Sequence, residues 1–84
     1  MAYYVYLIKT IKPYKLKSYV GYTNNLTKRV KNHNLGKGAK STRGYKWKII
    51  YKKRFLSKNK AMSYEYKLKK DRKLRLSIIK ELIS

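Results

Sequence analysis

The stretch that decides the fold is YVGYTNNLTKRVKNHNLGKGAKSTRGYKW, residues 19–47. It opens with a β-branched and aromatic run that ends at Gly21, which is typical of a strand. Residues 23–25 are helix-capping types. Four residues then recur at helical spacing: Leu26, Arg29, Val30 and His33. The stretch therefore predicts a strand, a helix that ends near Asn34 to Gly36, and a polar loop from Gly36 to Tyr45.

Two further strands are predicted on either side of this stretch. Tyr3 to Lys9 is apolar and aromatic, and Thr10 to Lys17, which contains Pro13, reads as a hairpin loop before the strand Ser18 to Tyr22. A short loop between two strands makes antiparallel pairing the simplest connection. Trp47 to Phe55 alternates apolar and basic residues, so it predicts the third strand.

Two helices are predicted to complete the chain. Residues 57–59 offer caps for a helix of about Lys60 to Lys70, and Asp71 is a plausible cap for a last helix. The apolar stripe of the first of these helices is Ala61, Met62, Glu65 and Leu68, with Tyr64 at its edge, and that of the second is Leu74, Ile78, Leu82 and Ile83. The order β-β-α-β-α-α predicts one small α/β domain, residues 1–84, with a three-stranded sheet.

The charge of the chain indicates its partner. Lys and Arg number 24 against three acids, which gives a net charge of +21. Such self-repulsion destabilises a compact monomer, and a polyanionic partner is the usual reason to keep it. Nucleic acid is the leading candidate, with an anionic membrane and ribosomal RNA as rivals.

Composition also excludes several classes of site. The absence of Cys excludes disulfides and thiolate metal sites, and a single His excludes a zinc site built from several histidines. No apolar run approaches the roughly 20 residues that span a bilayer, and no signal peptide is evident. We therefore expect a cytoplasmic protein with no membrane association.

Glu65 is the most informative acid. It shares a helical face with Ala61 and Leu68, where an isolated carboxylate costs several kcal/mol or shifts its pKa. A metal ion, an Arg or the edge of a cleft would stabilise it, and a salt bridge to one of the many Lys and Arg is an equally ordinary explanation. Mg²⁺ usually takes only one or two protein carboxylates, so a single acid is compatible with a phosphodiesterase.

Arg29, His33 and two tyrosines are the other candidate site residues. Arg29 and His33 are one helical turn apart and flank the apolar stripe, which aims them at the sheet. Arg can bind a phosphate bidentately, and His can hold or move a proton near neutral pH. Tyr6 and Tyr19 lie on adjacent predicted strands. Taken singly, each residue has a purely structural alternative: a surface cation, a helix C-terminal His, and cross-strand packing.

The joint pattern is more specific than its parts. Tyr4-Val5-Tyr6 and Tyr19-Val20-Gly21, followed by Arg29, His33 and Glu65, resemble the signature of the GIY-YIG nucleases. The stretch GKGAKSTRGY is similar to the small, single-domain YhbQ-like bacterial branch, and the wider segment also looks like the nuclease subunit of eukaryotic structure-specific resolvases. The resemblance covers roughly Tyr3 to Leu68. Two departures are Tyr4 where Gly is usual and the lack of an Asn after Asn59.

The resemblance implies an antiparallel sheet flanked by helices and a metal-dependent DNA endonuclease, either structure-specific or directed at single strands. It implies Mg²⁺ or Mn²⁺ on Glu65, a phenol of Tyr6 or Tyr19 near the attacking water, Arg29 on the phosphate, and His33 in proton transfer. A protein partner is a possible source of specificity. The residues expected to contact DNA are Gly21, Tyr22, Lys37, Lys40 and Arg43.

Two other functions fit the same charge. A non-catalytic nucleic-acid-binding module that retains the GIY-YIG fold would need the basic residues and tyrosines but no metal. A small ribosome-associated protein is the third reading. Glu65 distinguishes the nuclease from these two alternatives, because nucleic-acid binding alone does not require a carboxylate on that face.

Overall fold

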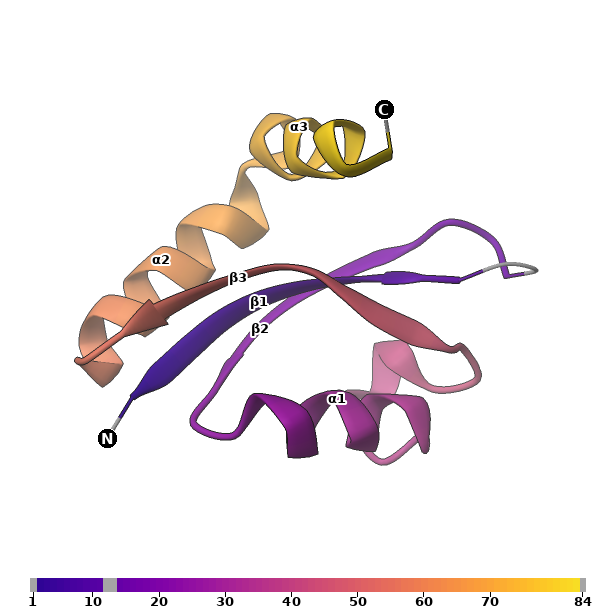
Figure 1. The fold of residues 1–84 in the computed structure, drawn as a ribbon, viewed down its shortest axis with the longest axis horizontal. Helices are drawn as coiled ribbons and strands as arrows, with labels where there is room; N and C mark the ends of the chain where they lie inside the picture. The colour runs from indigo at the N-terminus through magenta and orange to yellow at the C-terminus, as the bar shows by residue number, and fades with distance from the viewer. Residues whose placement is uncertain (1, 12–13, 84) are drawn as a thin grey trace.

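A three-stranded antiparallel sheet separates one helix on one face from two helices on the other (Figure 1). The structure is a computed structural model that describes residues 2–11 and 14–83. The strand order is β2-β1-β3, which puts β1 in the centre. The elements are β1 (Tyr3–Thr10), β2 (Ser18–Thr23), α1 (Leu26–Asn34), the 3₁₀ turn η1 (Lys40–Thr42), β3 (Trp47–Phe55), α2 (Lys58–Lys70) and α3 (Arg72–Ile83). The predicted element order and fold class are confirmed.

The hairpin between β1 and β2 is closed by a buried threonine. The Thr10 hydroxyl donates to the carbonyl of Lys15 at 2.7 Å and accepts from the backbone N–H of Lys17 at 3.0 Å. Both strands run one residue further than the sequence predicted, to Thr10 and Thr23. Pro13, which marked the predicted loop, lies outside the described residues.

The central strand divides its side chains between two cores. Because successive residues of a strand point to opposite faces, Val5 and Leu7 face α2 and α3, whereas Tyr6 and Ile8 face α1. The first core also contains Val20, Ala61, Leu68 and Ile79, and the second also contains Trp47. The sheet is therefore buried on both faces along β1.

A β-bulge in β3 changes the face to which its side chains point. Leu7 pairs with Tyr51 but Ile8 pairs with Ile49, so Ile50 is the extra residue. One extra residue reverses the alternation beyond it. Trp47 accordingly packs in the α1 core, and Tyr51 and Phe55 pack in the other.

Helix α1 is bounded by the caps that its sequence predicts. The Asn25 side chain accepts from the N–H of Lys28 at 3.1 Å. At the other end Gly36 adopts φ 76°, and its N–H donates to the carbonyl of His33 at 3.2 Å. The N–H of Lys37 reaches the carbonyl of Asn32 at 2.8 Å, which completes a Schellman motif.

Helix α2 begins two residues earlier than predicted, because Ser57 is its N-cap and accepts from the N–H of Lys60. Ala61 and Leu68 are fully buried, as expected, but Met62 is 43% exposed. The prediction that Met62 belongs to the buried stripe is wrong. At 3.6 residues per turn Met62 lies about 100° around the helix from Ala61, which carries it off the sheet.

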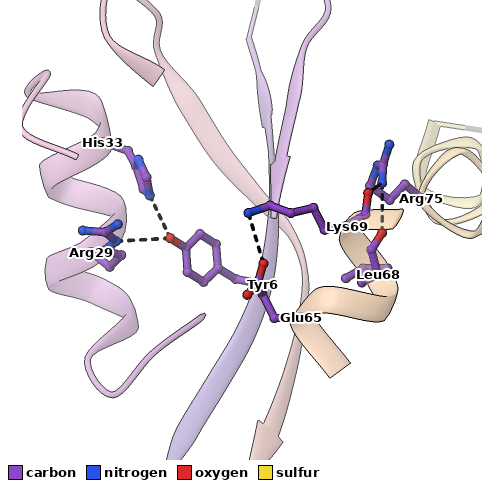
Figure 2. Close-up of polar contacts among 7 residues, drawn as sticks. All are labelled: Tyr6, Arg29, His33, Glu65, Leu68, Lys69 and Arg75. Carbon is purple, nitrogen blue, oxygen red and sulfur yellow. Dashed lines mark hydrogen bonds and ion pairs between the residues drawn. The ribbon is translucent and has the colours of Figure 1, made fainter. Parts of the chain in front are cut away.

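Helix α3 turns back over the same core. The Asp71 carboxylate accepts from the N–H of Leu74 at 2.9 Å, and Arg75 donates to the carbonyls of Leu68 and Lys69, which joins the two helices (Figure 2). Leu74 and Ile78 are half-buried, and Ile79 is buried, with 7% of its surface exposed. The side chains of Leu82 and Ile83 lie outside the described part. Across residues 2–11 and 14–83, we find no helix with the length and apolar character of a membrane span.

Candidate functional site

The site is organised around the hydroxyl of Tyr6. This side chain is completely buried and points from β1 toward α1. Its oxygen lies 2.8 Å from Nε2 of His33 and accepts a hydrogen bond from Nε of Arg29 at 3.3 Å (Figure 2). Arg29 and His33 are one turn apart on the face of α1 that meets the sheet, as predicted. The sequence thus places a phenol, a guanidinium and an imidazole in direct contact.

Gly21 makes room for this phenol. Tyr6 pairs with Gly21 across β1 and β2, and a Cβ at Gly21 would overlap the Tyr6 hydroxyl and lie 2.7 Å from Cζ. No residue with a side chain fits there without displacing the ring. The sequence predicted a nucleic-acid contact for Gly21, but the structure buries it beneath Tyr6.

The second tyrosine of the motif lies beside the first without the same bonds. The ring of Tyr19 is half-buried, 5.0 Å from the His33 ring and 6.4 Å from the Tyr6 ring between centroids. Tyr22, expected to contact DNA, packs against the core on the other face of the sheet. The structure therefore separates it from the site.

His33 is enclosed by two loop residues that the sequence did not single out. Its Nδ1 lies 2.9 Å from the hydroxyl of Thr42, and both side chains are fully buried. A Cβ at Gly38 would lie 2.5 Å from Nδ1, so the loop backbone lies directly against the ring. The stretch GKGAKSTRGY contains both residues, and its family likeness is the signal that could have found them.

Trp47 holds this loop in place. Its indole N–H donates to the carbonyl of Thr42 at 2.9 Å. The backbone N–H of Trp47 donates to Oδ1 of Asn34 at 2.6 Å, and Nδ2 of Asn34 donates to the backbone carbonyl of Trp47 at 3.2 Å. The start of β3 and the end of α1 are thereby joined around η1.

The pKa values of the phenol and the imidazole move away from neutrality. Burial, reinforced by the charge of Arg29, lowers the pKa of His33 to about 4, so the ring is neutral near pH 7. Burial raises the pKa of Tyr6, and this outweighs the opposing hydrogen bond and charge of Arg29. Desolvation is therefore a larger effect on the phenol than the positive charge beside it.

Arg29 lies between the buried phenol and an open hollow. Its hydrogen bond to Tyr6 raises its own pKa, so it stays charged. The hollow, of about 180 Å³, is lined by residues at the start of α1: Thr23, Asn24, Asn25, Lys28, Arg29 and Asn32. Arg29 is the residue that both contacts Tyr6 and lines this hollow.

Glu65 lies on α2, on the other side of the sheet from α1 (Figures 1 and 2). Its side chain is 16% exposed and forms an ion pair with Lys69 at 3.3 Å, whose side chain is 57% exposed. Burial is the main cause of the raised pKa of Tyr6, and the charges of Tyr19 and Glu65 raise it further. The carboxylate of Glu65 therefore lies within electrostatic range of the phenol. Tyr6, Tyr19, Arg29 and His33 lie together on the α1 side of the sheet, whereas Glu65 lies on α2 on the other side.

The surroundings of Glu65 suit a hydrated divalent cation held by one carboxylate. They do not suit a metal site made of several protein ligands. The described part of the chain contains no group of three or more His, Cys, Asp or Glu side chains that could hold a metal. Mg²⁺ commonly takes one protein carboxylate and completes its shell with water and phosphate oxygens. A single, partly exposed carboxylate whose partner is an exposed lysine meets that requirement.

The basic residues predicted to contact DNA lie on the loop that covers His33. Lys37, Lys40 and Arg43 are all exposed there. A separate hollow of about 440 Å³ lies beside α2 and the end of β3 and contains none of the predicted site residues. Its lining is Phe55, Asn59, Lys60, Ser63, Tyr64 and Lys67.

Comparisons with known proteins identify the family of this chain. Residues 2–77 match the GIY-YIG catalytic domain. A UPF0213 protein of Oceanobacillus iheyensis is 44% identical over 68 residues, which are 80% of this chain and 76% of that protein. A UPF0213 protein of Staphylococcus haemolyticus is 41% identical over 81 residues, 94% of this chain and 95% of that protein.

One solved structure matches as well. The solution NMR structure of the UPF0213 protein BH0048 from Bacillus halodurans is 36% identical, covers 95% of this chain and 84% of its own, and gives a TM-score of 0.49. The domain match alone spans Tyr6, Tyr19, Arg29, His33 and Glu65. This chain therefore belongs to the GIY-YIG family, in its UPF0213 group of small bacterial proteins.

Proposed function

We propose that this protein is a metal-dependent DNA endonuclease that hydrolyses phosphodiester bonds. The observation that carries the proposal is the Tyr6 hydroxyl, which is held between a charged Arg29 and a neutral His33. A structural tyrosine needs only one partner for its hydroxyl, whereas this one contacts both a proton acceptor and a phosphate-binding group. The net charge of +21 supplies the attraction for the polyanionic substrate.

Tyr6 accepts the proton of the attacking water. A guanidinium only donates hydrogen bonds, so the phenol oxygen accepts from Arg29 and its own proton is left for Nε2 of His33. As the water oxygen attacks phosphorus, the bond from phosphorus to the leaving ester oxygen breaks, the proton of the water moves to the Tyr6 oxygen and the Tyr6 proton moves to His33. The leaving oxygen then takes up a proton from solvent. The raised pKa of Tyr6 excludes a preformed phenolate near pH 7, which makes this coupled transfer necessary.

Arg29 opens the site when it binds the phosphate. The phenol is completely buried in the unbound protein, and the bond from Arg29 to it is long at 3.3 Å. A bidentate contact with a phosphate is stronger than this bond. Moving the guanidinium to the phosphate exposes the phenol. It also removes a charge that lowers the pKa of His33, which favours the proton transfer.

Glu65 would hold Mg²⁺ or Mn²⁺ through its carboxylate. When bound, such an ion stabilises negative charge on the phosphate and leaving oxygens. The ion pair with Lys69 does not prevent this role. Lys69 is 57% exposed, and an i,i+4 pair on a helix contributes only about 0.3–0.5 kcal/mol, so a divalent cation can replace this partner.

The loop of Lys37, Lys40 and Arg43 binds the DNA backbone beside the site. These side chains are exposed on the segment that packs over His33, so a strand that contacts them passes the Tyr6 hydroxyl. Such contacts read phosphate and shape, which suits single strands, duplexes or junctions alike. A protein partner would then supply any further specificity.

The second candidate is a non-catalytic nucleic-acid-binding module. One observation favours it: Glu65 already has an ordinary partner in Lys69, as expected for a carboxylate that binds no metal. In that case the basic surface is the functional part, and the Tyr6 contacts serve stability.

A plasmid-nicking assay with Glu65→Gln separates the two candidates. Purified protein should nick supercoiled DNA with Mg²⁺ and stop with EDTA. Glu65→Gln should cleave at least about 100-fold more slowly, since a catalytic metal contributes several kcal/mol, while DNA affinity is kept. Glu81→Gln is the matched control, because it removes the same charge from an exposed site on α3 and should cleave normally.

Undiminished cleavage by Glu65→Gln would remove the metal role. No cleavage by the wild-type protein on any substrate, together with intact binding, would favour the non-catalytic module. The substrates should therefore include single-stranded, duplex, flap and junction DNA, each with and without metal.

A further inference from the structure

The hydrogen bonds around His33 form an unbroken line of five groups. It starts at the Arg29 guanidinium and passes through the hydroxyl of Tyr6 and both nitrogens of His33. The Thr42 hydroxyl lies 2.9 Å from Nδ1 and donates to the carbonyl oxygen of Ala39 at 2.7 Å. Every side chain between the two ends is fully buried.

The two ends fix the direction of every bond between them. A carbonyl oxygen only accepts, so the single hydroxyl proton of Thr42 goes to Ala39, and its oxygen must accept from His33. At the other end a guanidinium only donates, so the Tyr6 oxygen accepts from Arg29. The Thr42 end requires Nδ1 to carry the proton and Nε2 to be bare, and the bare Nε2 is then the acceptor for the buried Tyr6 proton.

We infer that Thr42 sets the tautomer of His33 and is thereby a positioning residue for proton transfer by Tyr6. The bond made by one imidazole nitrogen decides which nitrogen carries the proton. With Nδ1 protonated, the bare Nε2 faces the phenol and can take its proton. With the other tautomer, Nε2–H would point at the phenol, and the route for that proton would be blocked.

The loop is built to hold Thr42 at this nitrogen. The Trp47 indole donates to the Thr42 carbonyl at 2.9 Å, and the backbone at Gly38 lies against the imidazole. No buried side-chain nitrogen or oxygen within the described ranges lacks a hydrogen-bond partner, so nothing nearby competes for Nδ1. Thr42 thus acts through His33, since its side chain is fully buried.

The test is ¹⁵N NMR of the imidazole on the full chain, with no DNA or metal. Protonated and bare ring nitrogens give well-separated ¹⁵N shifts, and the only His of the sequence gives one set of signals. We expect the wild-type protein to show protonated Nδ1 and bare Nε2. Thr42→Val, which keeps the shape and removes the acceptor, should lose that preference. Thr42→Ser should restore it, and Ser41→Ala, at the exposed neighbour, should match the wild type.

A second readout is the single-turnover cleavage rate. Thr42→Val should slow it by about 10- to 100-fold, the range seen when a partner that orients a functional imidazole is removed, with unchanged DNA affinity. Thr42→Ser and Ser41→Ala should cleave near the wild-type rate. This catalytic part rests on the proposed nuclease function, whereas the tautomer can be measured on a protein that cleaves nothing.

The outcomes separate the two claims. A wild-type ring with protonated Nε2, or a Thr42→Val spectrum identical to the wild type, overturns the tautomer assignment. A changed tautomer with undiminished cleavage overturns the catalytic role. If Thr42→Val does not fold, the wild-type and Thr42→Ser spectra still decide the assignment.

Discussion

Tyr6 and Tyr19 are alike in sequence and differ in surroundings. Tyr6 is completely buried and bonded to Arg29 and His33, whereas Tyr19 is half-buried and its ring lies 5.0 Å from that of His33 between centroids. Residue spacing could not separate them. The pairing does, because Tyr6 lies opposite Gly21 and its hydroxyl occupies the space that a Cβ there would fill, whereas Tyr19 lies opposite Ile8.

Replacement of each tyrosine by Phe tests this difference. Tyr6→Phe keeps the ring and removes the proton acceptor, so we expect cleavage to fall by about 100-fold or more, the usual range for a general base. Tyr19→Phe should lose less than about 10-fold. Both should bind DNA like the wild type, and circular dichroism should show that both fold. Equal losses in the two variants would contradict the assignment to Tyr6.

The neutral His33 makes stability depend on pH. The unfolded chain binds a proton near pKa 6.5 and the folded chain only near about 4. The contribution is therefore fully present above pH 6.5 and is lost as pH falls toward 4. Between pH of about 7 and about 5 the free energy of unfolding should fall by at most about 2 kcal/mol.

Urea unfolding at several pH values measures this effect. The groups that face His33 are Tyr6, Thr42, Arg29 and Tyr19. Because the chain has a single His, the slope that disappears in His33→Gln belongs to this residue. An unchanged slope in that variant would show that other groups cause the pH dependence.

At the scale of elements, the β1–β2 pair is built around one missing side chain. Gly21→Ala should destabilise the protein by about 1–3 kcal/mol, the usual cost of overpacking, because the new Cβ overlaps the Tyr6 hydroxyl. The cost should be smaller in a Tyr6→Phe background, where the nearest atom is gone. Urea unfolding of the two single variants and the double variant gives the comparison. Equal costs in both backgrounds would mean that the hydroxyl is not the obstacle.

Sequence patterns predicted the helices and strands well, but they predicted only some of the contacts between them. Caps at Asn25, Ser57 and Asp71 and the glycine at Gly36 fixed the helix ends because they act locally. The bulge at Ile50 was not foreseeable, since it serves the two cores and has no local signature. Met62 was misplaced because helical spacing gives relative angles and leaves the direction of the sheet unknown.

The sequence predicted that two of the candidate side chains face the sheet, and it missed the contacts that support them. Arg29 and His33 could be aimed at the sheet from their spacing, and the family resemblance marked Tyr6. Thr42 escaped because its role depends on a loop closing over His33, with bonds set by Trp47 far along the chain. No periodic pattern records such a contact.

At the scale of the whole molecule, the positive charge covers far more than the site. It is spread over 24 basic side chains, yet the loop beside the site carries only a few of them. If binding is focused there, these few should account for a large share of the salt dependence.

A charge-matched pair of triple variants tests this focus. Each loses three positive charges: Lys37, Lys40 and Arg43 from the loop, or Arg72, Lys73 and Lys80 from the exposed surface of α3, all changed to Gln. For duplex DNA each lost phosphate contact should make the slope of log affinity against log salt shallower by about 0.9. The loop variant should therefore lose about 2–3 units of slope, and the α3 variant almost none. Equal changes would indicate diffuse binding over the whole surface.

The alternation of β1 has a consequence for how the gene can change. Tyr6 belongs to the site, and its neighbours Val5 and Leu7 belong to the opposite core. Inserting or deleting one codon in this strand would exchange the two sets, sending a phenol into an apolar interior and an aliphatic side chain to Arg29 and His33. A one-residue insertion or deletion in β1 would therefore disrupt both the site and the opposite core. A point substitution affects only the face to which its side chain points.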